Sequence, residues 1–196
     1  IILMGHSMGS MIVRKYISKY DDIIDGLIVC GSPSKNKAAA FGLKIIKIME
    51  KIKGDKHRSK LIKKLMFGYN KKGELPNNWI CTNNEIVKKY NEDELCQYEY
   101  TLNGYENIVR LMLDTYNPKI YSKKNPHLPI LFIAGEDDPV ISSEKDWNSA
   151  QVFLKNLGYK NIKGILYPNQ RHEILNELEN EVVYNDILKW LNKIIK

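Results

Sequence analysis

The sequence predicts an α/β fold with a parallel β-sheet, and three observations carry this prediction. Four short apolar runs, at residues 1–4, 27–30, 128–134 and 161–167, have the pattern of buried strands. Amphipathic helical patterns separate the first two runs and the last two, as expected for parallel strands covered on both faces. A long helix-rich stretch separates the second run from the third. The pattern indicates part of an α/β sheet with an insertion at one crossover.

Residues 1–33 form the first part of the predicted core. They contain a strand, a glycine-rich turn, a helix and a second strand, at residues 1–4, 5–9, 10–20 and 27–30. Arg14 falls on the polar side of the helix. The second strand is stopped by Gly31-Ser32-Pro33.

Residues 34–125 have a different character. Lys, Asn and Tyr dominate, and helical patterns replace strands. Helices are predicted over residues 41–52, 85–95 and 105–116. We therefore expect a helical cap inserted between two strands of the sheet.

The strand pattern returns in residues 126–196, the second part of the core. A strand, a helix, a strand and a closing helix follow one another, at residues 128–134, 143–157, 161–167 and 177–195. Ser142 or Ser143 can cap the first of these helices, and Gly158 stops it.

The 196 residues carry a net charge of +7, which raises the question of nucleic-acid binding. Nearly all the basic residues are Lys, whereas base readout and bidentate phosphate contacts favour Arg. We therefore expect no nucleic-acid partner. The many Lys, Ile and Asn residues fit drift in an AT-rich genome. The charge is nevertheless concentrated in residues 33–75, where thirteen basic residues stand against three acidic ones.

Cysteine usage favours a reducing compartment. Cys30, Cys81 and Cys96 are odd in number and lack CxxC spacing, so we predict neither a disulfide framework nor a metal site. No signal peptide is visible, and no apolar run approaches the ~20 residues that span a bilayer. These features predict a cytoplasmic protein. The chain begins at Ile1, within a strand, so a missing N-terminal segment leaves the compartment open.

Gly5-His6-Ser7-Met8-Gly9 fits G-x-S-x-G, the pattern of a nucleophile elbow. A sharp turn between a strand and a helix exposes the Ser7 hydroxyl, and Gly5 and Gly9 let the backbone pack tightly. The helix that follows directs its N-terminus, including the Met8 N–H, at a developing oxyanion. We expect His6 to point elsewhere. The alternative is a glycine-rich turn with a passive serine.

A serine nucleophile needs a base and an orienting acid. His172 follows the fourth strand, and Asp137 and Asp138 follow the third. Active sites of open α/β sheets gather at these carboxyl ends of strands. The alternatives are a solvated surface histidine and an Asp-Pro turn. Nucleophile, acid and histidine nevertheless follow one another in the order that a hydrolase of this fold uses.

These stretches resemble α/β-hydrolases of the monoacylglycerol lipase and lysophospholipase type. The resemblance rests on residues 5–10, on residues 128–140 and on residues 167–177. In that family the acid lies three residues after the strand-ending glycine and just before Pro-Val, which selects Asp138 over Asp137. Arg171-His172-Glu173 also matches the surroundings of the family's histidine, and residues 34–125 lie where the family has its helical cap.

The resemblance implies a serine hydrolase of lipid esters, either lysophospholipids or monoacylglycerols. Ser7, Asp138 and His172 would form the triad, the Met8 N–H would bind the oxyanion, and no cofactor or metal is needed. A peptidase, a thioesterase, a short-chain esterase and a non-catalytic protein of the same fold stay open. Enzymes of this type have earlier strands and a second oxyanion N–H before the elbow. We therefore expect the C-terminal part of a longer hydrolase, inactive on its own.

The predicted cap helix over residues 41–52 is amphipathic. This helix could rest on a lipid surface or meet an anionic head group. The simpler interpretation, which we favour, packs its apolar face on the hydrolase body and leaves the lysines in water. The apolar face carries Phe41, Ile45, Ile48, Met49 and Ile52, and Lys44, Lys47 and Lys51 lie off it.

Overall fold

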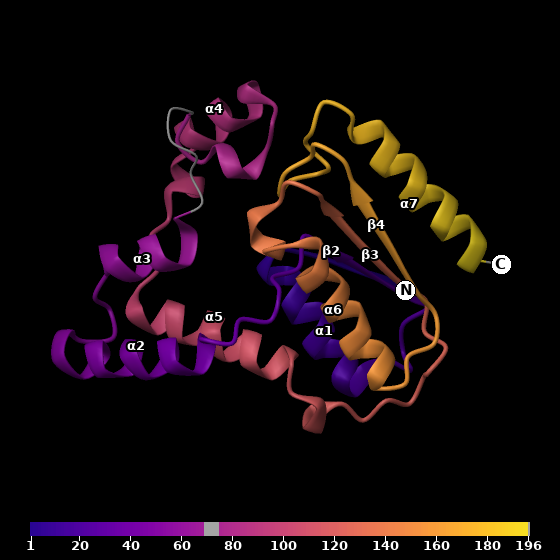
Figure 1. The fold of residues 1–196 in the computed structure, drawn as a ribbon, viewed down its shortest axis with the longest axis horizontal. Coiled ribbons are helices and arrows are strands. Elements are labelled where there is room, and N and C mark those ends of the chain that lie inside the picture. Colours follow the sequence, from indigo (N-terminus) through magenta and orange to yellow (C-terminus); the bar gives the residue numbers. More distant parts are fainter. Residues whose placement is uncertain (69–74, 196) are drawn as a thin grey trace.

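The computed structural model describes residues 1–68 and 75–195 and contains a parallel four-stranded sheet with helices on both faces (Figure 1). The strands are β1 (Ile2–His6), β2 (Gly26–Cys30), β3 (Ile130–Gly135) and β4 (Ile162–Tyr167), in the spatial order β1-β2-β3-β4. Strands β2 and β3 are buried along their whole length because both faces of the sheet are covered. The predicted α/β fold class is confirmed.

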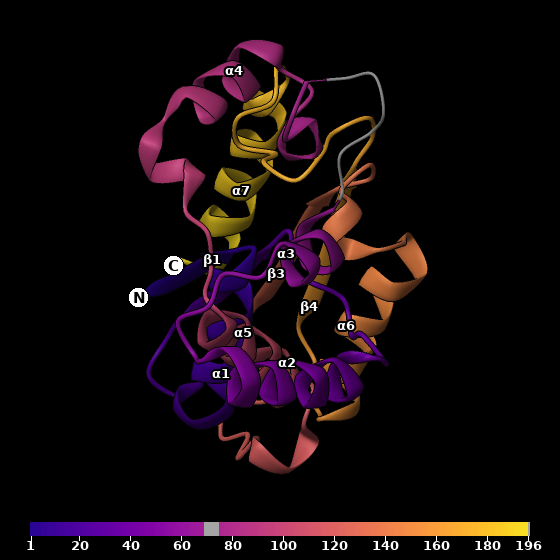
Figure 2. The ribbon, with the colours of Figure 1, turned by 90° about the vertical axis from the view of Figure 1, so that its left-hand side faces the viewer.

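Helices cover the two faces of the sheet in separate layers. Helix α1 (Met8–Tyr20) and helix α6 (Glu144–Asn156) pack on one face, and helix α7 (Asn180–Ile194) packs on the other (Figures 1 and 2). In register, Leu27 of β2 lies beside Ile130 of β3. The first face buries Val13, Ile17, Leu27, Val29, Phe132, Trp147 and Leu154, and the second buries Ile28, Leu131, Ile133, Val183 and Trp190.

The described residues between β2 and β3 form helices and 3₁₀ turns without a strand, and we call this segment the cap. Helices α2 and α5 pack on each other, and α5 also packs on α1, which joins the cap to the sheet layers. Ile46, Tyr105 and Val109 lie in the core of the cap. The elements are α2 (Ala39–Lys53), α3 (Lys60–Phe67), η1 (Asn78–Ile80), α4 (Asn84–Glu92), η2 (Glu94–Gln97), α5 (Leu102–Thr115) and η3 (Pro118–Ile120).

Several element boundaries differ from the predicted ones. Strand β1 continues through Gly5 and His6, so the turn is confined to Ser7. The helix predicted over residues 85–95 ends early, because Asp93 is extended and caps the separate 3₁₀ turn η2. Helix α3 was not predicted. A further 3₁₀ turn, η4 (Pro139–Ile141), follows β3.

Arg14 departs most clearly from its pattern, since it is 0% exposed instead of lying on a polar face. Its guanidinium carbon lies 4.4 Å from the centre of the Tyr116 ring, and its Nη1 donates to Ser32 Oγ at 3.3 Å. The reason is tertiary, because helix α5 and Tyr116, its C-cap, cover this side of α1. Within the described ranges, no helix is both long and apolar enough to span a bilayer.

Candidate functional site

The predicted nucleophile lies where β1 becomes α1. Ser7 has a φ of 55° and a ψ of −122°, and such a left-handed φ is uncommon outside glycine. Its N–H donates to the Cys30 carbonyl at 3.0 Å, and its carbonyl accepts from the Ser10 N–H at 3.0 Å. These bonds hold the strained turn at the carboxyl edge of the sheet. The backbone therefore has the form of a nucleophile elbow.

Only glycine fits at position 5. A Cβ on Gly5 would lie 2.3 Å from the Gly9 carbonyl oxygen and 2.9 Å from the Ser10 nitrogen, because the first turn of α1 packs directly on β1. A Cβ on Gly9 would meet nothing within 4 Å. The expected tight packing therefore applies to Gly5 and not to Gly9.

Asp138 and His172 form a buried hydrogen-bonded pair. Nδ1 of His172 lies 2.9 Å from Oδ2 of Asp138, and both residues are buried. The other Asp138 oxygen accepts from the Val140 N–H at 2.8 Å, so the carboxylate is held on both sides. Asp137 is exposed. The structure thus brings Asp138, and not Asp137, to the histidine.

His6 does not point away from the site, and that expectation is wrong. Its Nε2 lies 3.0 Å from the His172 carbonyl oxygen, and the two imidazole centres are 4.5 Å apart. Burial, and then the neighbouring His172, lowers the pKa of His6, so that a neutral ring donates Nε2–H to this carbonyl. Gly31, with a φ of 52°, makes room for both rings, since a Cβ there would lie 3.2 Å from each.

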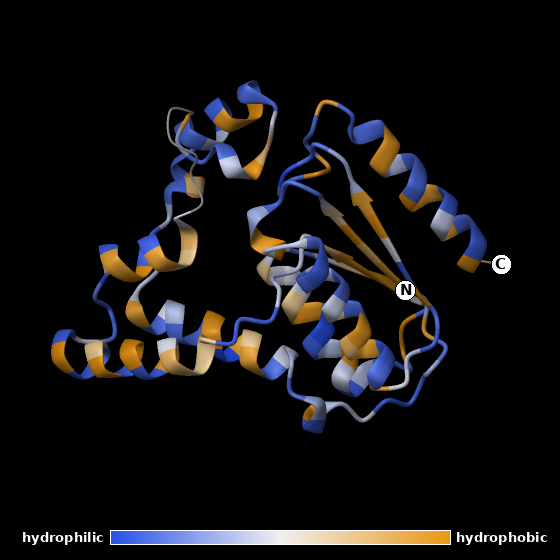
Figure 3. Cartoon of the chain, viewed as in Figure 1, coloured by the Kyte–Doolittle hydropathy of each residue, from blue (hydrophilic) through white to orange (hydrophobic). Residues whose placement is uncertain are grey.

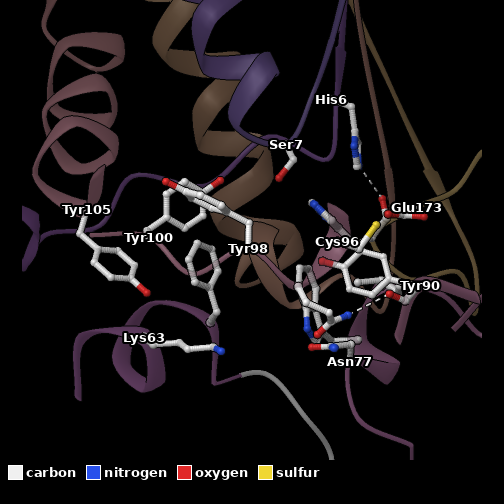
Figure 4. A pocket seen from close by; sticks show the side chains of 15 residues that line it. His6, Ser7, Lys63, Asn77, Tyr90, Cys96, Tyr98, Tyr100, Tyr105 and Glu173 are labelled. Atoms are coloured by element: carbon white, nitrogen blue, oxygen red, sulfur yellow. Dashed lines mark hydrogen bonds between the residues drawn. The ribbon is translucent and has the colours of Figure 1, made fainter. Parts of the chain in front are cut away.

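Ser7, His6 and His172 line one cavity of about 370 Å³. Figure 4 shows Ser7 at one end of this cavity, with tyrosine rings of the cap segments facing it. A lysine of the cap, Lys63, also lines the wall, and its Nζ lies 2.6 Å from the Glu99 carboxylate. Among the described residues, the aromatic lining consists of Phe67, Trp79, Tyr90, Tyr98, Tyr100 and Tyr105.

The cap contacts the histidine directly, which the sequence did not indicate. The Trp79 ring lies 5.2 Å from the His172 ring. The Glu173 N–H donates to the Ile80 carbonyl at 2.6 Å, so the residue after the histidine is bonded to the 3₁₀ turn that carries Trp79. No local pattern in the sequence marks this contact.

The predicted site residues are therefore gathered, but not all are bonded to one another. Within the described residues, no hydrogen bond joins the Ser7 hydroxyl to the His172 ring. Met8 is the first residue of α1, so its N–H has no acceptor inside the helix. No cluster of three or more His, Cys, Asp or Glu side chains suited to a metal occurs in residues 1–68 and 75–195.

Comparison with known proteins agrees with this geometry. Residues 1–179 match the family model described as serine aminopeptidase, S33. The chain belongs to this family. The resemblance to α/β-hydrolases that the sequence predicts is thereby confirmed.

Solved structures similar to this chain include proteins named as esterases and lipases. A thermostable carboxyl esterase from Bacillus coagulans has a TM-score of 0.87 and 26% identity, over 100% of this chain and 65% of its own. The monoacylglycerol lipase of Paleococcus ferrophilus has a TM-score of 0.68 and 21% identity, over 98% of this chain and 68% of its own. The monoglyceride lipase of Saccharomyces cerevisiae has a TM-score of 0.69 and 18% identity, over 98% of this chain and 61% of its own.

The chain matches only part of the length of these relatives. The chain spans 65% of the length of the esterase and 61% of that of the yeast lipase. A further match, of 37% identity over 73 residues, is to the phenylalanine–tRNA ligase beta subunit of Ureaplasma parvum. It covers 37% of this chain and 9% of that protein, and so carries no argument about function.

Proposed function

We propose that this chain provides the nucleophile, base and acid of a serine hydrolase that cleaves carboxylic esters of lipids. The observation that carries the proposal is the buried Asp138–His172 hydrogen bond beside a cavity whose wall includes Ser7 on its strained elbow. A neutral histidine held by a carboxylate at Nδ1 has its Nε2 free to accept a proton.

In the proposed reaction, Ser7 Oγ attacks the ester carbonyl carbon while His172 Nε2 accepts the hydroxyl proton. Asp138 keeps the imidazole in the correct tautomer and stabilises its protonated form. The ring then gives the proton to the departing alcohol oxygen as the ester C–O bond breaks. Water next attacks the acyl-enzyme, with His172 as base, which releases the carboxylic acid and restores Ser7.

The Met8 N–H is the oxyanion donor that this chain offers. It begins helix α1, where the orphan N–H groups and the helix dipole favour negative charge. Such a donor acts where charge develops in the transition state. Because Ser7 and His172 are not hydrogen-bonded in the described structure, the Ser7 hydroxyl must turn toward Nε2 when substrate binds.

The cavity supports a lipid ester with a small head group as substrate, either a monoacylglycerol or a lysophospholipid. Its aromatic lining offers apolar area to an acyl chain, and the tyrosine hydroxyls offer hydrogen bonds to a polar head. The similar solved structures, a carboxyl esterase and two monoacylglycerol lipases by name, agree with this class.

One observation favours a second candidate, a peptidase. Glu173 lines the cavity directly after His172, and a carboxylate there could pair with the ammonium group of a peptide N-terminus. The same triad would serve amide cleavage. Aminoacyl anilides, monoacylglycerols, lysophospholipids and short-chain esters offered to one preparation would separate the two candidates.

The test of the proposal is Ser7→Ala in the longest natural form of the protein that contains residues 1–196. Ester hydrolysis and labelling of the protein by a fluorophosphonate probe should both be lost. Ser149→Ala, an exposed serine on α6, is the matched control and should keep both. Labelling or hydrolysis that survives Ser7→Ala would remove the proposed nucleophile.

A further inference from the structure

Helix α2 exposes an apolar stripe that the fold does not use. We call Phe41, Ile45, Ile48 and Ile52 the outer stripe; Phe41 is 68% exposed and Ile52 is 75% exposed. The interpretation that packs this face on the hydrolase body is therefore wrong. Only Met49 of the predicted apolar face is partly packed in the core of the cap.

The outer stripe lies opposite the buried side of the helix. At 3.6 residues per turn, its four residues fall within roughly 60° of one another around the helix axis. Ile46, which packs against helix α5, lies on the far side and is 2% exposed. Two separate apolar faces thus occur on one helix, and packing among the residues that the structure describes accounts for only one.

Helix α3 carries exposed apolar side chains of its own. Leu61 and Leu65 are one turn apart, and Leu65 is 71% exposed. Figure 2 shows α2 and α3 together on the side of the molecule that faces the viewer, and Figure 3 shows apolar and polar residues alternating along both helices. Exposed apolar side chains on two neighbouring helices are a feature of interaction sites.

Lysines without acidic partners accompany the apolar residues. Lys44 and Lys51 of α2, and Lys60 and Lys64 of α3, are exposed and form no salt bridge within the described part of the chain. Lys47 has only a long contact of 3.9 Å to Glu106. The surface therefore combines apolar side chains with uncompensated positive charge.

We propose that this face of α2 and α3 docks on an anionic lipid surface. Apolar side chains at the acyl boundary and lysines at the head groups are the pattern of a helix that lies in a membrane interface. A second copy of the same chain fits poorly, because a two-fold contact would place these lysines against themselves. Docking would bring the aromatic cavity, to which α3 contributes Lys63 and Phe67, close to its lipid source.

The docking proposal stands apart from the proposed reaction. It concerns the outer surfaces of α2 and α3, and binding is measured without turnover. Vesicle binding can therefore fail while ester hydrolysis persists, and hydrolysis can fail while the vesicles still bind.

The first experiment measures sedimentation with phosphatidylcholine vesicles, with and without phosphatidylserine. The protein should bind only the anionic vesicles, and added salt should weaken the binding. Changing Lys44 and Lys51 to Gln should lower the affinity on the order of tenfold. Changing Lys155 and Lys160 to Gln, the same charge change on and just after α6, should leave it unchanged.

The second experiment removes the apolar part with Ile48→Gln and Ile52→Gln, both exposed and therefore tolerated by the fold. Vesicle affinity should again fall tenfold or more, whereas Val152→Gln with Leu188→Gln, exposed apolar residues elsewhere, should have no effect. Absent binding to anionic vesicles, or equal binding by all variants, would overturn the proposal. If light scattering showed a dimer that dissociates in the Ile48→Gln variant, the proposal would also be overturned, because the outer stripe would then be the contact surface with a second copy of the chain.

Discussion

The Glu177 carboxylate accepts hydrogen bonds from both the backbone N–H and the hydroxyl of Thr82, and so ties the cap to the histidine loop. Glu177 is buried, and its Oε1 also accepts from the Arg171 N–H at 2.8 Å. Arg171 in turn donates to the Asn78 carbonyl at 2.6 Å. The loop is therefore bonded to the cap on both sides of His172, by Arg171 before it and by Glu177 after it.

Replacing Glu177 by Gln should weaken these hydrogen bonds between the cap and the loop that carries His172. An amide oxygen in place of Oε1 can still accept from both backbone N–H groups, but the NH₂ group then faces the Thr82 N–H and hydroxyl where Oε2 accepted from them. All of these bonds also lose the charge of the carboxylate, which makes them weaker. We expect the free energy of unfolding to fall by about 1–3 kcal/mol. In the longest natural form of the protein, we also expect kcat for ester hydrolysis to fall while KM changes little, because His172 is held less firmly and the cavity wall remains.

Glu179→Gln is the control for this change. It removes the same charge two residues away, at an exposed position without a side-chain cap bond. Thr82→Ser should behave like the native protein, since it keeps the hydroxyl, whereas Thr82→Val should resemble Glu177→Gln in kcat. An unchanged kcat in Glu177→Gln would mean that the hydrogen bonds of Glu177 have no part in positioning His172.

The sequence predicts the site residues whose role depends on near neighbours in the chain, and it misses those whose contacts are distant in the chain. Gly5 and Ser7 follow from a local requirement, a strand that turns into a helix within a few residues, and spacing alone marks such a turn. Thr82 and Glu177 are 95 residues apart, and neither belongs to a periodic pattern. Such contacts depend on how the cap packs against the rest of the protein, and no single segment of the sequence determines that packing.

Helix periodicity has a related limit. It identifies an apolar face on residues 41–52 but not the element that covers it. Ile46 and Phe41 are both apolar, and only the position of α5 makes one buried and the other exposed. Arg14 shows the reverse, since its charge predicts a solvated face and Tyr116 covers it.

Asp138→Asn should disable the proposed catalysis while keeping the fold. The amide retains an oxygen for the Val140 N–H, but its NH₂ group faces Nδ1 of His172 and favours the wrong tautomer. We expect kcat to fall on the order of 10⁴-fold. Asp137→Asn, at the exposed neighbour, should retain activity, and steady-state kinetics of the two variants side by side gives the comparison.

His6 should make stability depend on pH in weak acid. Its pKa is lowered by burial, so below about pH 6.5 the unfolded chain takes up a proton that the folded protein resists. The contribution is fully present above that pH and is lost as the pH falls toward the lowered pKa. Denaturant titrations should show the native protein losing more stability on acidification than His6→Gln does.

The His6→Gln comparison isolates this one group. Glutamine can still donate to the His172 carbonyl, and the charged groups that face His6, namely His172, Glu173 and Asp138, are unchanged in both proteins. The two proteins therefore differ only in the group at position 6. Parallel loss of stability in the two proteins would show that His6 is protonated as readily in the folded state as in the unfolded one.

Arg14→Met should stabilise the protein. The guanidinium is 0% exposed, its one hydrogen bond to Ser32 is 3.3 Å long, and its Nε and Nη2 atoms lack partners among the described residues. Burying a charge with so few bonds opposes folding by several kcal/mol, and the ring of Tyr116 at 4.4 Å offsets only about 2 kcal/mol of that. Methionine fills a similar volume without the charge.

For Arg14→Met we expect the free energy of unfolding to rise by about 1–3 kcal/mol, whereas Arg14→Ala should lower it by leaving a cavity. A loss of stability in Arg14→Met would show that the contacts with Tyr116 and Ser32 outweigh the desolvation of the guanidinium.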